Sequence, residues 1–149
     1  HNCLVGSEMC IRDRYRTDFK CHNDSNIVIT KDPQYPSLKI YSGIEWKNIS
    51  TKLQSLQSLD PIVRNIQWTI LGNAHETNID INGRMLIRIP NDLQRYAEIE
   101  DKKQIALVGM GKKFEVWNID SWEMRQTGGS LSTEILDVVL PESIKSMSF

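Results

Sequence analysis

The sequence predicts an α+β fold that is mainly β, made of two similar halves with strands followed by a helix. Three observations lead to this class. Short runs of β-branched and aliphatic residues lie between turn-forming residues, and two segments show helical periodicity. Apolar and aromatic positions also recur at a constant offset between the halves. We therefore expect a duplicated, mainly β domain with flanking helices.

Composition limits the classes of protein that fit. The chain has 149 residues, of which 40% are hydrophobic and 25% charged, as in soluble globular domains. Its net charge of -1 gives no overall attraction to nucleic acid, so DNA binding would need a local patch. No apolar run approaches the roughly 20 residues that cross a bilayer, and the start does not resemble a signal peptide. We expect a cytoplasmic protein without membrane contact.

The N-terminal segment differs from the rest. Residues 1–13 show neither strand nor helix periodicity and resemble the translation of a sequencing-library adapter, so we interpret them as non-native. The segment contains Cys3 and Cys10, and no cysteine pair has C-x-x-C spacing, so neither a disulfide framework nor a zinc site is expected. Native-looking sequence begins near Arg14. Loss of a first hairpin here would leave sheet edges unpaired.

The first half contains two strands and two helices. Ile27–Thr30 and Leu38–Tyr41 should pair as strands, and a helix should follow Ser42. Its apolar face recurs every three or four residues: Trp46, Ile49, Leu53 and Leu56. The second helix, 60–72, has Asp60 as N-cap, Pro61 at its first position and Gly72 for a left-handed end. Its expected apolar face is Ile62, Val63, Ile66 and Ile70.

The central stretch from Asn78 to Ala97 has the clearest local signals. Asn82-Gly83 lies between two aliphatic runs and predicts a hairpin with a type I′ turn, because both turn residues need positive φ. Arg84 follows the turn. Pro90 should end the second strand and begin a short helix over 91–97.

The second half repeats the first. Gln104–Val108 and Phe114–Trp117 are expected strands around a glycine-containing turn at 109–113. A helix should begin near Asp120 and stop at Gly128-Gly129, before a mobile tail over 128–149. One offset relates four residues of the first half to Phe114, Val116, Trp117 and Trp122: Leu38, Ile40, Tyr41 and Trp46. We expect a truncated first repeat at 14–59, a linker helix at 60–72 and a second repeat at 73–127.

From Arg14 to about Gln126 the chain resembles the MraZ family. The resemblance is carried by five groups of residues: Asp80-Ile81-Asn82-Gly83-Arg84 with Pro90 and Leu93, Leu107-Val108-Gly109, Lys113-Phe114-Glu115-Val116-Trp117, Leu71-Gly72-Asn73-Ala74, and Tyr41 with Glu45-Trp46. It implies a swapped-hairpin β-barrel related to AbrB and MazE, assembled as a closed ring of identical chains. It also implies a nucleoid-associated, non-enzymatic regulator of the division and cell-wall genes, without a cofactor. Such proteins bind direct repeats in double-stranded promoter DNA through Asp-x-x-x-Arg loops.

The expected DNA-binding residues are Asp80, Asn82, Gly83, Arg84 and Arg88. An arginine can read guanine O6 and N7 or clamp a phosphate, and Asp80 could orient Arg84 across the turn. From the pattern alone, Asn82-Gly83 is more often a plain turn and Arg84 a solvated charge; the resemblance reverses this preference. Lys112-Lys113 lies in the other expected hairpin turn, and we interpret these lysines as solubilising turn residues rather than as DNA contacts.

Two other functional classes stay open. One is an antitoxin-like or purely structural interaction module that does not bind specific DNA. The other is a metal-dependent enzyme, but His75-Glu76 and Cys21-His22 lack the spacing of metal ligands, and no catalytic motif is present.

Overall fold

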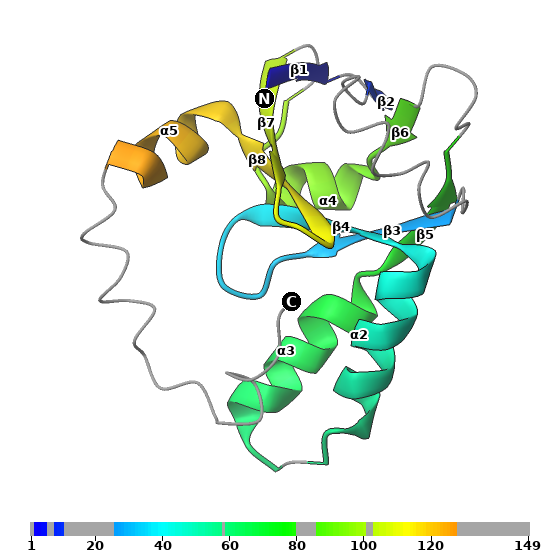
Figure 1. Ribbon diagram of the computed structural model, residues 1–149. Helices are drawn as coiled ribbons and strands as arrows, with labels where there is room; N and C mark the ends of the chain where they lie inside the picture. Colours follow the sequence, from blue (N-terminus) through cyan, green and yellow to red (C-terminus); the bar gives the residue numbers. More distant parts are fainter. Residues whose placement is uncertain are drawn as a thin grey trace.

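The computed structural model describes residues 2–5, 8–10, 26–57, 59–79, 86–100 and 103–127. Eight strands from these ranges form one antiparallel sheet with the order β5-β3-β4-β8-β7-β1-β2-β6 (Figure 1). The strands are β1 (Asn2–Val5), β2 (Glu8–Cys10), β3 (Asn26–Lys31), β4 (Ser37–Ser42), β5 (His75–Asn78), β6 (Leu86–Arg88), β7 (Lys103–Gly109) and β8 (Lys113–Asn118). The helices are α2 (Gly43–Ser55), α3 (Pro61–Gly72), α4 (Asn91–Tyr96) and α5 (Ile119–Thr127). The α+β, mainly β class is confirmed.

The two halves exchange strands within this sheet. β3 pairs with β4, and β7 pairs with β8, as the sequence predicts. However, β5 of the second half pairs with β3 of the first, and β1, from the N-terminal segment that precedes the first repeat, pairs with β7 of the second. β4 and β8 join the halves in the middle. This interleaving is consistent with the swapped-hairpin arrangement that the resemblance implies.

The N-terminal segment corrects one expectation. Although residues 1–13 have no strand periodicity, Asn2–Val5 and Glu8–Cys10 form strands that pair with β7 and β6. We expected the loss of a first hairpin to leave sheet edges unpaired, whereas β1 and β2 pair with the edges of β7 and β6. Sheet pairing uses backbone N–H and C=O groups, which every non-proline residue carries, so a segment can join a sheet without an alternating pattern.

Apolar side chains gather in two clusters. The larger one lies between the strands and α4, and the smaller one joins the sheet to α2 and α3. The larger cluster contains Ile27, Ile29, Leu38, Ile40, Ile79, Ile87, Ile89, Leu93, Ala97, Ile99, Ile105, Leu107, Phe114 and Val116. The smaller contains Tyr41, Ile49, Leu53, Val63, Ile66 and Ile70. Because the adjacent residues Ile40 and Tyr41 enter different clusters, β4 is covered on both faces.

The helix signals are confirmed with three corrections. The Ser42 side chain accepts a hydrogen bond from the Glu45 amide, and Asp60 accepts one from the Ile62 amide. Ile62 is 43% exposed rather than part of the apolar face, and Trp68, whose spacing in the sequence is typical of a core residue, is 63% exposed. Gly72 has no positive φ: α3 instead ends with the Asn73 side chain donating to the Thr69 carbonyl. No helix in the described ranges is long and apolar enough to cross a membrane.

β4 and β8 meet about a local twofold relation. Lys39 lies opposite Glu115, and these positions correspond at the offset that relates Leu38 to Phe114. Corresponding ring pairs also form: Tyr41 with Trp46 at 5.9 Å, and Trp117 with Trp122 at 5.7 Å between centroids. Equivalent positions cap the following helices, since Ser42 caps α2 and the Asn118 side chain accepts from the Asp120 amide.

Candidate functional site

The loop that carries the expected DNA-binding residues joins β5 to β6. Asp80, Asn82, Gly83 and Arg84 lie outside the described residues, but the chain on both sides is firmly packed. Ile79 is 2% exposed and Ile87 is 1% exposed, and both belong to the larger core cluster.

The described parts of β5 and β6 correct the simple hairpin that we expected. β5 pairs with β3 and β6 pairs with β2, so in the described ranges these two strands hydrogen-bond to other strands rather than to each other. The turn itself, at 82–83, is outside the described residues. The Asn-Gly pair predicts positive φ at two positions. It does not predict which strands the flanking residues pair with.

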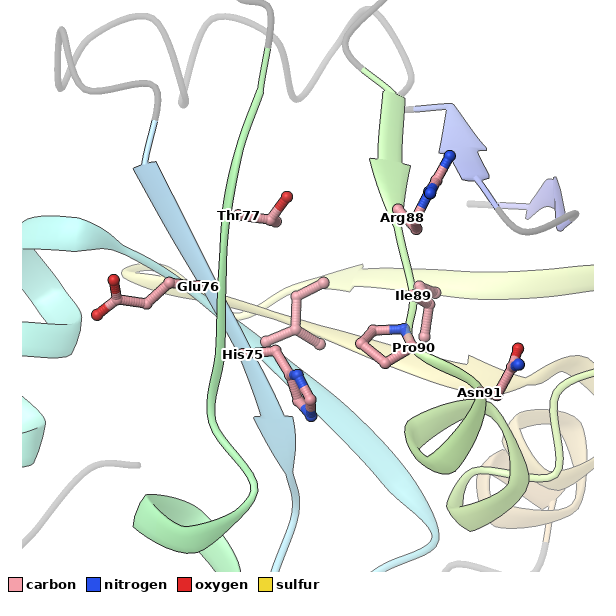
Figure 2. Close-up of a pocket in the computed structure, with 8 residues that line it drawn as sticks. His75, Glu76, Thr77, Arg88, Ile89, Pro90 and Asn91 are labelled. Atoms are coloured by element: carbon pink, nitrogen blue, oxygen red, sulfur yellow. The ribbon is translucent and has the colours of Figure 1, made fainter.

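A groove of about 510 Å³ lies between β5 and the segment from β6 to α4. It is lined by Ile29, His75, Glu76, Thr77, Arg88, Ile89, Pro90 and Asn91. Figure 2 shows His75 on one side of the groove and Pro90 and Asn91 on the other, with Glu76 turned to the opposite side of β5. Arg88, the one expected site residue in the described ranges, is exposed on β6 at the groove rim.

α4 holds the β6 side of the groove in place. Pro90 precedes the helix, as expected, and the Gln94 amide donates to the Pro90 carbonyl over 3.0 Å. The Gln94 side chain, 8% exposed, donates to the Ile89 carbonyl over 2.8 Å. Both carbonyls just after β6 are thereby satisfied without sheet pairing, so the strand can end abruptly beside Arg88.

A second set of contacts ties α4 to β3. The Tyr96 hydroxyl donates to the Asp32 carbonyl, and the Lys31 ammonium lies 5.0 Å from the centre of the Tyr96 ring. Burial, reinforced by the charge of Asp32, raises the pKa of Tyr96 above its ordinary value. Tyr96 therefore stays protonated and available as a donor across the physiological range.

His75 and Asp92 bridge the groove, and the sequence did not reveal this contact. The His75 Nε2 atom lies 3.5 Å from a carboxylate oxygen of Asp92, with the two side chains 42% and 48% exposed. The pair is ionic only when the imidazole is protonated. The sequence shows only that Asp92 lies in the first turn of a short helix. An aspartate is common there because it interacts favourably with the helix dipole, so its position does not predict a contact with His75.

The structure separates the other basic candidates from this groove. Lys112 and Lys113 lie at the turn between β7 and β8 and line a different pocket, next to α2. The groove at β5 and β6 therefore depends for positive charge on Arg88 and on His75 when it is protonated.

The MraZ family model, described as "MraZ protein, putative antitoxin-like", matches residues 70–130. Several curated relatives carry the name "Transcriptional regulator MraZ". The relative from Legionella pneumophila (strain Corby) is 33% identical over 140 residues, covering 94% of this chain and 90% of that protein. The relative from Hydrogenovibrio crunogenus is 36% identical, with 99% and 93% covered, and that from Shewanella piezotolerans is 40% identical, with 75% and 71% covered. Identity at this level over nearly the whole length shows common descent, and the chain belongs to the MraZ family.

Proposed function

We propose that this chain is a sequence-specific, DNA-binding transcriptional regulator that recognises direct repeats in promoter DNA of the division and cell-wall genes. The observation that carries the proposal is that Ile79 and Ile87, which lie on either side of the expected DNA-binding residues, are both buried in the core. The regulator name of its relatives supports the same class of function.

In this proposal Arg84 is the principal DNA contact. Its guanidinium would read guanine or clamp a phosphate, and Asp80 would orient it. Arg88 is exposed on the adjoining strand and would contact the backbone of the same duplex. Asn82 and Gly83 would supply the tight turn that lets the loop enter a groove.

Oligomerisation would supply the affinity that one loop lacks. A chain with net charge -1 has little non-specific attraction to DNA. If several copies in a closed ring meet tandem repeats, each contact after the first becomes intramolecular and strengthens the whole. We therefore propose that promoter repeats and ring assembly act together, in the cytoplasm at the nucleoid.

The test is a mobility-shift titration against promoter DNA that carries the repeats. We expect Arg84→Ala to weaken binding at least about tenfold, since a bidentate arginine contact is worth roughly 1–3 kcal/mol and is repeated in each protomer. The slope of affinity against salt should also become shallower, because fewer counterions are released.

Arg64→Ala is the matched control. Arg64 is exposed on α3, where its guanidinium lies 5.2 Å from the Trp68 ring, and its replacement removes the same charge away from the groove. Equal DNA affinity of the Arg84→Ala protein and the parent chain at the same salt concentration would refute the role of Arg84.

The antitoxin-like description of the family model favours one alternative, a protein-interaction module. It predicts a stable complex with a co-purifying protein and no shift of repeat-bearing DNA. The same titration, with purification of the intact complex, separates the two functions.

A further inference from the structure

A second pocket lies away from the DNA-binding loop, between α2 and the turn that joins β7 to β8. Its volume is about 390 Å³, which is within the range of small-molecule sites. It is lined by Tyr41, Glu45, Asn48, Ile49, Lys52, Met110, Gly111, Lys112 and Lys113. These residues come from a strand, a helix and a turn, so the fold and not one local motif creates the pocket.

The lining is basic in a chain that is slightly acidic overall. The lining contains three lysines, Lys52, Lys112 and Lys113, and one carboxylate, Glu45, while the charges of Asp32 and Glu115 act from outside the lining. Gly111 has φ of +78°, which shapes the turn so that Lys112 and Lys113 follow it at the rim. Concentration of cations around a concave space favours an anion there.

Tyr41 provides an independent sign of a missing partner. This residue lines the pocket and is 1% exposed, yet its hydroxyl has no hydrogen-bond partner among the residues that the structure describes. Burial, together with the charges of Asp32 and Glu115, raises the pKa of Tyr41, so the hydroxyl stays protonated and can donate. Leaving such a donor unpaired in a buried position is unfavourable, and a bound acceptor would remove this cost.

The electrostatic environment of Lys113 also favours an anion nearby. Partial burial, followed by the nearby charge of Lys39, lowers its pKa from 10.5 to about 8, although Glu115 and Asp32 act in the opposite direction. An anion in the pocket would offset both effects and return the ammonium form to stability.

In the other half of the protein, side chains occupy the space that corresponds to this pocket. At the offset that relates Tyr41 to Trp117, the position of Ile49 corresponds to Arg125. The Arg125 guanidinium lies 3.8 Å from the centre of the Tyr35 ring and 5.5 Å from that of Trp117, so side chains close the space between α5 and the β3–β4 turn. Around Tyr41 the corresponding space is open and basic.

We propose that the pocket between α2 and the β7–β8 turn binds the phosphate group of a small phosphorylated molecule, held by Lys112, Lys113 and the Tyr41 hydroxyl. Phosphate accepts charge-assisted hydrogen bonds from ammonium groups, and the remaining volume admits an organic part. A concave pocket of this size suits a free ligand better than a phosphodiester on the convex surface of a duplex. This site does not depend on the DNA-binding role of Arg84.

The experiment is an NMR titration of the full chain, labelled with ¹⁵N, with inorganic phosphate, phenyl phosphate and a short DNA duplex. We expect saturable shifts of the Tyr41, Gly111, Lys112 and Lys113 amides with the first two probes. Affinity should fall about tenfold in Lys113→Met and in Lys112→Met, the loss expected for one charged hydrogen bond. Lys112 is exposed, so its variant keeps the test valid if Lys113→Met does not fold.

Tyr41→Phe separates binding from structure. It should weaken phosphate binding, yet raise the thermal midpoint of the ligand-free protein, because it removes an unpaired buried hydroxyl. A purely structural tyrosine would not give these opposite changes. Lys47→Met, on the exposed surface of α2 and outside the pocket lining, is the matched charge control and should bind phosphate like the parent chain.

Sulfate, whose charge is constant near neutrality, tests the pH dependence. The pKa of Lys113 should rise above about 8 when sulfate is bound, and sulfate affinity should fall as pH rises through that range. Shifts that chloride reproduces, or unchanged affinity in both lysine variants, would overturn the proposal. Saturation by the duplex but not by the two small phosphates would reassign the pocket to DNA and overturn the choice of a free ligand.

Discussion

At the scale of single residues, the most consequential side chain outside the proposed sites is Lys39. It is 6% exposed at the centre of the β4–β8 pairing, and its ammonium lies 3.4 Å from Asp32 and 3.7 Å from Glu115. In a symmetric pairing of identical repeats, corresponding residues would meet here as like charges. The duplicated chain places lysine in one half and glutamate in the other, which makes the central contact attractive.

We predict that Lys39→Met lowers the free energy of unfolding by about 3 kcal/mol, because it leaves two carboxylates at low exposure without their shared cation. Urea denaturation measured by circular dichroism would show this loss. Lys47→Met, which removes an exposed lysine, should change stability by less than about 0.5 kcal/mol. If the Lys39 variant is as stable as the parent chain, the central ion pair does not stabilise the fold.

At the scale of elements, the glycine at the end of α3, Gly72, and the glycine in the turn between β7 and β8, Gly111, have different roles. Gly111 has φ of +78°, in the region that glycine adopts without strain, and an added Cβ there would meet no atom within 4 Å. Gly72 ends α3 without a positive φ, and an added Cβ there also meets open space. Sterically the two positions are equal, so the backbone angle alone should decide the effect of an alanine.

We predict that Gly111→Ala destabilises the protein by about 1 kcal/mol, the usual cost of a left-handed conformation. Gly72→Ala should instead stabilise it by about 0.5 kcal/mol by lowering the entropy of the unfolded chain. Thermal denaturation of the two variants measures the difference. Equal midpoints would contradict the assigned turn geometry.

At the scale of the whole molecule, strand exchange makes the two halves interdependent. The pairings β3–β5 and β4–β8 cross between the halves, and β1 of the N-terminal segment pairs with β7. We propose residues 14–59 and 73–127 as the two repeats, with α3 as their link. Neither repeat could keep its sheet partners if the other unfolded.

We therefore predict one cooperative unfolding transition. Fluorine NMR of the chain labelled with 5-fluorotryptophan reports separately on Trp46 in the first half and on Trp117 and Trp122 in the second, without any substitution. Their folded signals should disappear at the same urea concentration, because the shared sheet must break as a unit. Separate midpoints would show that the halves fold independently.

The local elements were largely readable from the sequence. The strands around Ile29 and Leu107, the caps at Ser42 and Asp60, and the start of α4 after Pro90 all follow from short-range preferences. The duplication could be predicted from the constant offset between the halves. In the structure, the corresponding aromatic residues form corresponding ring pairs. The exposure of Trp68 was not readable, because helical spacing cannot tell which face of α3 meets α2.

By itself, then, the sequence determined the type of most elements, Asp80 and Arg84 as candidate DNA contacts, and the resemblance to one family. The tertiary structure decided which strands pair, that Asn2–Val5 joins β7, and that Tyr41 and Lys113 share a basic pocket with α2. The physical reason is the distance along the chain over which each kind of interaction acts. Turn, cap and periodicity signals act over a few residues, whereas strand exchange depends on contacts between residues far apart in the chain, which no local pattern encodes.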